Sequence, residues 1–138
     1  MRLVIDTNCF MAGLLKDSTS RSIILHWDFH FYAPDFLMQE VNKYEDYIKK
    51  KAKLTDEQYK QTFYLLLEKV SLVPFEDFRS EFSKAEQIMS DIDIKDSPFI
   101  AVGLALNING IWSEDDDLRK QSVLEVYSTG DLYNIMQN

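Results

Sequence analysis

Two carboxylates stand where the chain leaves an apolar segment with the composition of a buried strand. Asp6 directly follows Leu3-Val4-Ile5, and Asp115 comes shortly after Ile111-Trp112-Ser113. Open parallel sheets bind their ligands beyond the carboxyl ends of their strands. Two acids delivered to that edge from opposite ends of the sequence therefore predict one site. Taken alone, Asp6 is equally consistent with an Asx turn or a helix cap.

Glu40 is a third candidate, because it lies on the apolar side of a helix predicted over residues 34–50. On a helical projection Glu40 falls between Tyr47 and Tyr44 rather than opposite them. The structural alternative is a surface ion pair with Lys43, three residues further on. Such a pair belongs on the polar face of a helix, so the position favours a functional carboxylate.

Asp96 is the fourth candidate, at the head of a helix that Ser97-Pro98 begins. The residues that follow are apolar on every side of this helix, which predicts that it is buried. Acidic side chains are also common at helix N-termini, where the helix dipole stabilises them. Asp96 taken alone would be assigned that structural role, and Asp93 has the same ambiguity with less support.

The segment that carries Asp115 is acidic at four successive positions, Glu114 to Asp117. A solvated acidic loop and a capped short helix are both consistent with it. The sequence alone leaves open which of Asp115, Asp116 and Asp117 faces a site.

Together the four acids predict a site for a divalent metal. Carboxylates are hard ligands suited to Mg²⁺ or Mn²⁺, and such ions keep water molecules that a substrate phosphate can replace. A metal held in this way activates water and stabilises charge on phosphorus. The hypothesis is a metal-dependent phosphodiesterase, with RNA as the expected polymer substrate.

Length and composition restrict the class of protein. At 138 residues, 46% hydrophobic, the chain is long enough for one buried core and too short for two ordinary domains. We expect no membrane span and no signal peptide, because no apolar run is long enough and Asp6 interrupts the first one. The single cysteine, Cys9, excludes an internal disulfide and suits a reducing, cytoplasmic setting.

The net charge of −8 argues against non-specific binding of nucleic acid. All of the imbalance lies in residues 70–138, which carry 13 acidic and 5 basic side chains. The basic patch open to a phosphate backbone is Lys49-Lys50-Lys51 with Lys53. His26 and His30, four residues apart, fit ordinary packing better than a metal pair.

Strand and helix candidates alternate along the chain. Strands are predicted at 2–5, 31–33, 72–73, 111–112 and 123–126. Helices are predicted after a cap at Ser20 or Ser22 and over 34–50, 55–70, 76–90, 97–106 and 130–136, with a short helix between the last two strands. This alternation predicts an α/β layered fold with parallel strand pairing.

The order of these motifs resembles a PIN domain. The matching segments are Val4-Ile5-Asp6-Thr7-Asn8, Ala33-Pro34 with Glu40 six residues on, 96–101, and 111–118. The chain looks most like the small VapC-type toxin ribonucleases. The resemblance implies a single domain over 1–138 with a three-layer α/β/α fold and a central, mostly parallel sheet of about five strands.

The resemblance also implies functional residues. By position, Asp6, Glu40, Asp96 and Asp115 match the catalytic acids, and Asp6, Asp96 and Asp115 the ligands of Mg²⁺ or Mn²⁺. Asn8, Ser113 and Asp117 match residues that line the pocket. RNA is the implied substrate, a homodimer the implied assembly, and a small antitoxin the implied partner of a toxin member.

Two departures and two alternatives accompany the resemblance. Glu114 and Asp116 make the last motif unusually acidic, and the acidic C-terminal half opposes approach of RNA. A haloacid-dehalogenase-type phosphatase also begins with a strand and an Asp, but it needs a second Asp where this chain has Asn8. A catalytically silent PIN scaffold that binds RNA or a protein is the other alternative.

Overall fold

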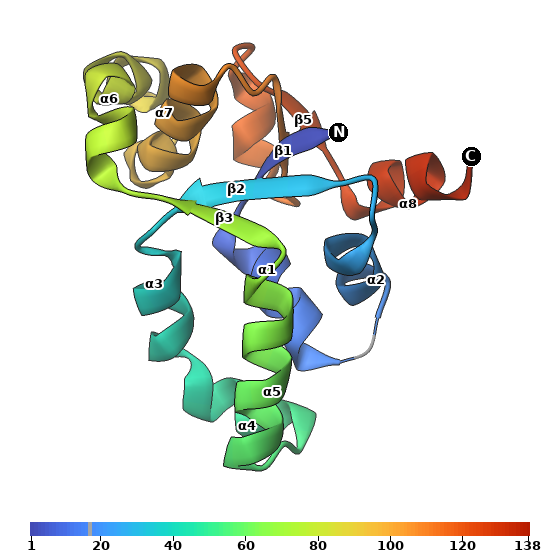
Figure 1. Ribbon diagram of the computed structural model, residues 1–138. Coiled ribbons are helices and arrows are strands. Elements are labelled where there is room, and N and C mark those ends of the chain that lie inside the picture. The colour runs from blue at the N-terminus through green and yellow to red at the C-terminus, as the bar shows by residue number, and fades with distance from the viewer. Residues whose placement is uncertain (17) are drawn as a thin grey trace.

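The computed structural model describes residues 1–16 and 18–138, and five parallel strands form one sheet at its centre (Figure 1). The strands are β1 (Arg2–Ile5), β2 (His30–Pro34), β3 (Val70–Val73), β4 (Gly110–Trp112) and β5 (Glu125–Tyr127). Their order across the sheet is β3-β2-β1-β4-β5, and every adjacent pair is parallel. The predicted α/β class and five-stranded sheet are confirmed.

Helices cover both faces of the sheet, which gives three layers. One layer holds α1 (Thr7–Leu15), α2 (Thr19–Leu25), α3 (Leu37–Lys43), α4 (Glu45–Ala52), α5 (Asp56–Leu67) and α8 (Thr129–Gln137). The other holds α6 (Phe75–Met89) and α7 (Ser97–Leu106), which lie together on the opposite side in Figure 1. Two short 3₁₀ turns, Ile94–Asp96 and Asp116–Lys120, precede α7 and follow β4.

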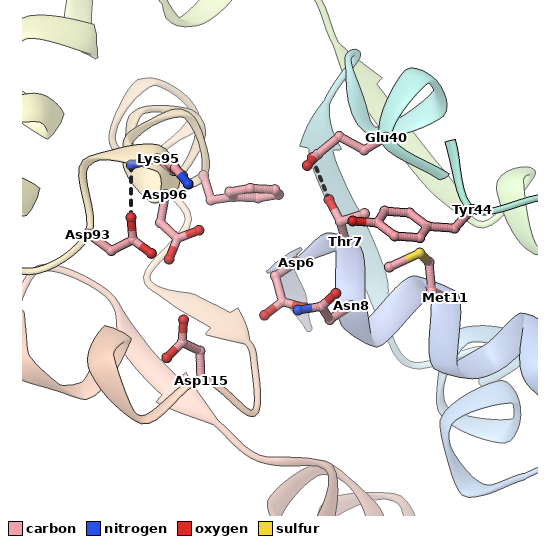
Figure 2. A pocket seen from close by; sticks show the side chains of 11 residues that line it. Asp6, Thr7, Asn8, Met11, Glu40, Tyr44, Asp93, Lys95, Asp96 and Asp115 are labelled. Carbon is pink, nitrogen blue, oxygen red and sulfur yellow. Dashed lines mark hydrogen bonds between the residues drawn. The ribbon is translucent and has the colours of Figure 1, made fainter. Parts of the chain in front are cut away.

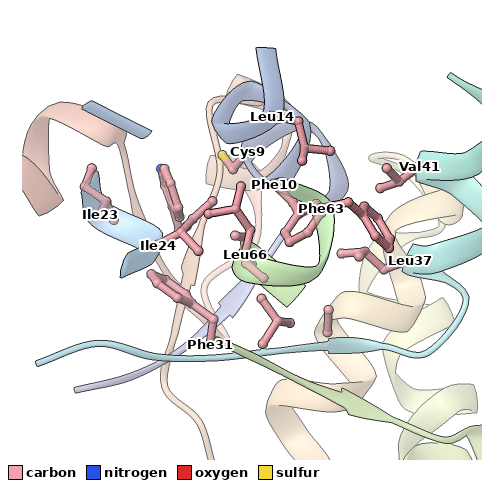
Figure 3. Close-up of a cluster of buried hydrophobic side chains, with 14 of the residues drawn as sticks. Cys9, Phe10, Leu14, Ile23, Ile24, Phe31, Leu37, Val41, Phe63 and Leu66 are labelled. Atoms are coloured by element: carbon pink, nitrogen blue, oxygen red, sulfur yellow. The ribbon is translucent and has the colours of Figure 1, made fainter. Parts of the chain in front are cut away.

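Alternation along β1 divides the buried side chains between two cores. Leu3 and Ile5 pack into the core beneath α1, α2 and α5, whereas Val4 packs against α6 and α7. Successive side chains of a strand point to opposite faces, so a strand covered on both sides is apolar throughout. Figure 3 shows the first core, where the rings of Phe10 on α1 and Phe63 on α5 pack edge to face.

The region around Glu40 differs from the helix predicted over 34–50. Pro34 is the last residue of β2 and pairs with Val73, and the helical segment that follows is divided at Tyr44. Tyr44 donates its N–H to the carbonyl of Val41 and accepts the N–H of Ile48, so it ends α3 and begins α4. The break lets both helices pack against α1.

Smaller corrections concern the ends of helices. The cap predicted at Ser20 or Ser22 is wrong, because α2 begins at Thr19 with Ser18 as N-cap. The helix predicted to reach residue 70 ends at Leu67, since Val70 starts β3 beside Phe31. Within the described residues, no helix has both the length and the apolar character needed to cross a lipid bilayer.

Candidate active site

The site lies at the carboxyl ends of β1 and β4, where the strand order of the sheet reverses. Ile5 pairs with Trp112, and the N–H of Asp6 donates to the carbonyl of Trp112 over 3.2 Å. The chain leaves β1 toward β2 on one side and returns by β4 on the other. Parallel sheets open a crevice at such a point, and the loops after the two strands converge there.

A pocket of about 290 Å³ occupies this position (Figure 2). All four carboxylates predicted as catalytic line it. The complete lining is Asp6, Thr7, Asn8, Met11, Glu40, Tyr44, Asp93, Lys95, Asp96, Phe99 and Asp115. Residues far apart in the sequence therefore form one acidic cavity.

Asp6 is the N-cap of α1 and lines the pocket. Its Oδ1 accepts the N–H of Cys9 over 2.8 Å, and its side chain is nearly buried. Burial raises the pKa of Asp6 above the ordinary value, and hydrogen bonding from Ser113 and Cys9 opposes that shift. The helix cap considered as an alternative role for Asp6 is therefore present, and it occupies Oδ1 of a carboxylate that also lines the pocket.

Asp93, Asp96 and Asp115 form the tightest acidic group of the pocket. Each offers a carboxylate oxygen, and the three oxygens lie within 4.8 Å of one another. Burial, and after it the negative charges of Asp93 and Asp115, raise the pKa of Asp96 to about 7. Asp96 makes no side-chain cap on α7, although it stands at the N-cap position. Its carboxylate is therefore available to bind a cation.

The group differs in one member from the predicted metal ligands Asp6, Asp96 and Asp115, since Asp93 stands in it and Asp6 lies outside it. Asp93 is the N-cap of the 3₁₀ turn Ile94–Asp96. Residues three apart lie on the same side of such a turn, which brings Asp93 beside Asp96. The spacing Asp-Ile-Lys-Asp is consistent with two neighbouring carboxylates, but it predicts them only if the segment is known to form a 3₁₀ turn.

Glu40 lies on the opposite wall, on α3. The Thr7 hydroxyl donates to Oε1 of Glu40 over 2.8 Å, as the dashed line in Figure 2 shows. The alternative ion pair between Glu40 and Lys43 is not among the salt bridges of the described residues. Thr7 was not predicted as a site residue, although its position directly after Asp6 was an indication that it lies near the site.

The comparison with protein families agrees with this geometry. The family model of the PIN domain matches residues 4–128, which is most of the chain. This chain belongs to the PIN domain family. No curated protein matched it. PIN domains are generally nucleases, a class of hydrolases, and the acidic cluster fits the divalent metal that such enzymes usually use.

The pocket of this PIN domain also contains residues that were not predicted from the sequence. Lys95 is the one cation among the lining residues, between Asp93 and Asp96 in sequence, and Tyr44 and Met11 contribute apolar surface. The position of Lys95 between Asp93 and Asp96 could have indicated that it belongs to the site. The place of Tyr44 in the lining depends on the helix break, which was not predicted.

The three predicted pocket residues have different positions. Asn8 lines the pocket, but Ser113 and Asp117 do not. Ser113 is buried beneath it, where its Oγ accepts the N–H of Asp115 over 3.0 Å. Asp117 pairs with Lys120 over 2.8 Å, so its charge is used outside the pocket.

The acidic residues of the motif after β4 differ from one another in their contacts. Glu114 accepts the N–H of Thr129 at the start of α8, and Asp116 is exposed. Asp115 lines the pocket, and its Oδ1 accepts the N–H of Asp117 over 2.9 Å. Three neighbouring aspartates therefore have three different environments.

Lys49 and the pair of histidines, two further candidates from the sequence, have structural explanations. Lys49 of the basic patch binds Asp56 at 2.8 Å and Glu45 at 3.0 Å, so its charge is compensated within the protein. His26 caps α2 while His30 begins β2, so the two do not share a helix face.

Proposed function

We propose that this PIN domain is a metal-dependent endoribonuclease that hydrolyses the phosphodiester bonds of RNA. The observation that carries the proposal is the group formed by Asp93, Asp96 and Asp115, opposite Asp6 and Glu40 in one pocket. Membership of a family of nucleases supports phosphodiester hydrolysis.

The electrostatics of the pocket favour a divalent cation. Three carboxylate oxygens within 4.8 Å repel one another, and that repulsion contributes to the raised pKa of Asp96. Either a proton or a cation relieves it. Two or three carboxylates at the edge of an open cavity suit Mg²⁺ or Mn²⁺, because these ions retain water molecules and bind few protein ligands.

The residues of the two walls have distinct roles in the proposed reaction. A Mg²⁺ or Mn²⁺ ion bound by the acidic group would polarise the phosphate and lower the pKa of a bound water. Asp6 lies between that group and α1, close enough for its charge to raise the pKa of Asp96. Glu40, with one oxygen held by Thr7, has a second oxygen to accept the proton of the attacking water. Lys95 provides a positive charge for the substrate phosphate.

The proposal extends to the biological setting. We propose a toxin of a toxin–antitoxin pair, present in the cytoplasm as a homodimer and silenced by a small antitoxin. The resemblance of the motifs to VapC-type ribonucleases supports this setting. The rival function is a silent PIN scaffold. Five acids in one cavity argue against it, because a scaffold gains nothing from their mutual repulsion.

Cleavage of RNA by the purified chain tests the proposal, in EDTA, Mg²⁺ and Mn²⁺. We expect metal-dependent cleavage that Asp96→Asn abolishes. Asp116→Asn is the matched control, because Asp116 is an exposed acid of the neighbouring motif outside the pocket. Equal cleavage by wild type and Asp96→Asn would identify a contaminant. Absence of cleavage with a metal-induced rise in Tm would indicate a real metal site with a different substrate, whereas absence of both would favour the scaffold.

Thermal unfolding with increasing Mn²⁺ distinguishes the metal ligands predicted from the sequence, which include Asp6, from the acidic group of the structure, which includes Asp93 instead. A cation bound only by the folded state stabilises it by about 2.7 kcal/mol at a hundred times its Kd. We expect Asp93→Asn and Asp96→Asn to remove most of the rise in Tm, and Asp116→Asn to leave it intact. A rise that depends on Asp6 and not on Asp93 would restore the ligand set predicted from the sequence.

A further inference from the structure

One exposed tyrosine lies at the pocket, directly before α4, and a second exposed tyrosine and a lysine lie on that helix. Tyr44 lines the pocket and is 49% exposed, and Tyr47 is 56% exposed. Lys51 lies one further turn along the helix and is also exposed. Tyr47 and Lys51, four positions apart, share one side of α4, and Tyr44 is the N-cap residue that precedes this helix at the pocket.

Tyr47 and Lys51 are already arranged as a pair. The Lys51 ammonium donates to the Tyr47 hydroxyl over 3.1 Å and lies 5.5 Å from the centre of its ring. An aromatic face and a cation are thus presented side by side to solvent. By contrast, Lys49 on the same helix is bound to Glu45 and Asp56 and has no free charge to offer.

We propose that Tyr44, Tyr47 and Lys51 are the substrate-positioning surface of the nuclease. Bases of a single-stranded nucleic acid stack on the two rings, and Lys51 binds the phosphate between or beside them. The scissile phosphate then lies at the acidic group. This inference rests on the proposed function and deepens it, because it names residues that select single strands.

Stacking resolves a difficulty that the charge of the chain creates. A net charge of −8 and an acidic pocket repel a polyphosphate, so the protein gains little affinity from the backbone of RNA. Base stacking on aromatic rings does not depend on that charge and contributes about 1–3 kcal/mol per base. A single strand exposes its base faces, whereas a duplex has already stacked them on each other.

The local charge and spacing fit the same occupant. The segment 43–53 contains five lysines and two acids, in a chain that is acidic overall. Helix positions three residues apart are separated by about 4.5 Å along the axis, of the same order as the ~3.4 Å between bases of one strand. The surface is also continuous with the pocket, since Tyr44 belongs to both.

Binding of fluorescent RNA by Asp96→Asn, which keeps the surface but lacks cleavage, tests the inference. The probe is a short single-stranded RNA that carries 2-aminopurine, whose fluorescence falls when the base stacks. We expect Tyr44→Ala and Tyr47→Ala, each added to Asp96→Asn, to weaken binding about tenfold and to restore fluorescence. Tyr44→Phe and Tyr47→Phe keep the rings and should retain both. Duplex RNA of the same sequence should bind weakly in every case.

Tyr64→Ala is the matched control, because Tyr64 is 57% exposed on α5 and does not line the pocket. Added to Asp96→Asn, it should leave RNA binding unchanged, and in the cleaving chain it should leave the cleavage rate unchanged. In the cleaving chain, Tyr47→Ala should raise KM with little change in kcat, the pattern expected when binding common to substrate and transition state is removed.

The other outcomes separate the two proposals. Cleavage of RNA by all tyrosine variants with unchanged KM would overturn the stacking surface and leave the nuclease intact. Tyrosine-dependent binding without cleavage by the wild type would support the surface and overturn the nuclease. A changed oligomeric state in Tyr47→Ala, with unchanged RNA binding, would assign the face to a protein partner and overturn the inference.

Discussion

The hydroxyl of Thr7 donates to the carboxylate of Glu40 over 2.8 Å and joins the first turn of α1 to α3. The two residues are 33 positions apart in sequence and meet because both helices begin at the carboxyl edge of the sheet. The bond holds one wall of the pocket, where Glu40 faces the acidic group across the cavity (Figure 2).

Thr7→Val should loosen this wall with little change in side-chain volume. The variant leaves Glu40 without its partner, so we expect a loss of about 1 kcal/mol in the free energy of unfolding. We also expect slower RNA cleavage, because Glu40 is no longer held toward the substrate. Urea denaturation and the cleavage rate measure the two effects. Thr7→Ser keeps the hydroxyl and is the control; a rate equally reduced in Thr7→Ser and Thr7→Val would show that the bond is not responsible.

The stability of the metal-free protein should depend on the ionisation of Asp96. Its pKa is about 7 in the folded chain and near 3.8 in the unfolded one, so the folded state binds the proton more tightly. In EDTA, stability should therefore fall as pH rises from about 4 to about 7 and change little above that range. For a half-buried carboxyl, screened by solvent, the contribution is on the order of 1–2 kcal/mol.

Asp96→Asn removes that titration and provides the comparison. At pH 8 in EDTA the variant should be more stable than the wild type, and the difference should disappear at pH 4. Chemical denaturation at a series of pH values measures it. A variant that is less stable than the wild type at pH 8 would contradict the raised pKa. Protons and Mn²⁺ compete for this carboxylate, so the metal-induced rise in Tm should also be larger at pH 8 than at pH 6.

Lys95→Ala should weaken RNA binding without loss of the fold. Lys95 is exposed at the rim of the pocket and is the one cation among the lining residues, so we expect its ammonium to contact a substrate phosphate. Loss of one phosphate contact reduces the slope of log affinity against log salt concentration by about 1. Filter binding at several salt concentrations measures the slope. Lys120→Ala removes a lysine that pairs with Asp117 outside the pocket, and it should leave the slope unchanged.

The order of helices and strands, and the position of acidic residues at the carboxyl edge of the sheet, could be predicted from the sequence. Val4 and Ile5 before Asp6, and Ile111 and Trp112 before Ser113, predict strands that end at polar residues. Helix caps and apolar periodicity are local signals, so α5 begins after Thr55 and α7 is buried as predicted. Parallel pairing then places the strand ends together, because a crossover helix returns each strand to the same edge.

The tertiary structure decided which acids meet. Asp93 belongs to the acidic group because a 3₁₀ turn places it beside Asp96, whereas Asp117 pairs with Lys120 and does not line the pocket. Identical side chains in one acidic segment cannot be distinguished by type or spacing. Their roles depend on partners supplied by other elements.

The same holds for the wall on which Glu40 lies. Its partner Thr7 comes from another helix, and the break at Tyr44 follows from packing of α3 and α4 against α1. A continuous helix would be the local preference of this segment, but burial of Val41 and Ile48 against the first core outweighs it. The sequence by itself determined the fold class and the acidic edge, since both follow from local patterns. Only contacts between distant elements decided the composition of the pocket.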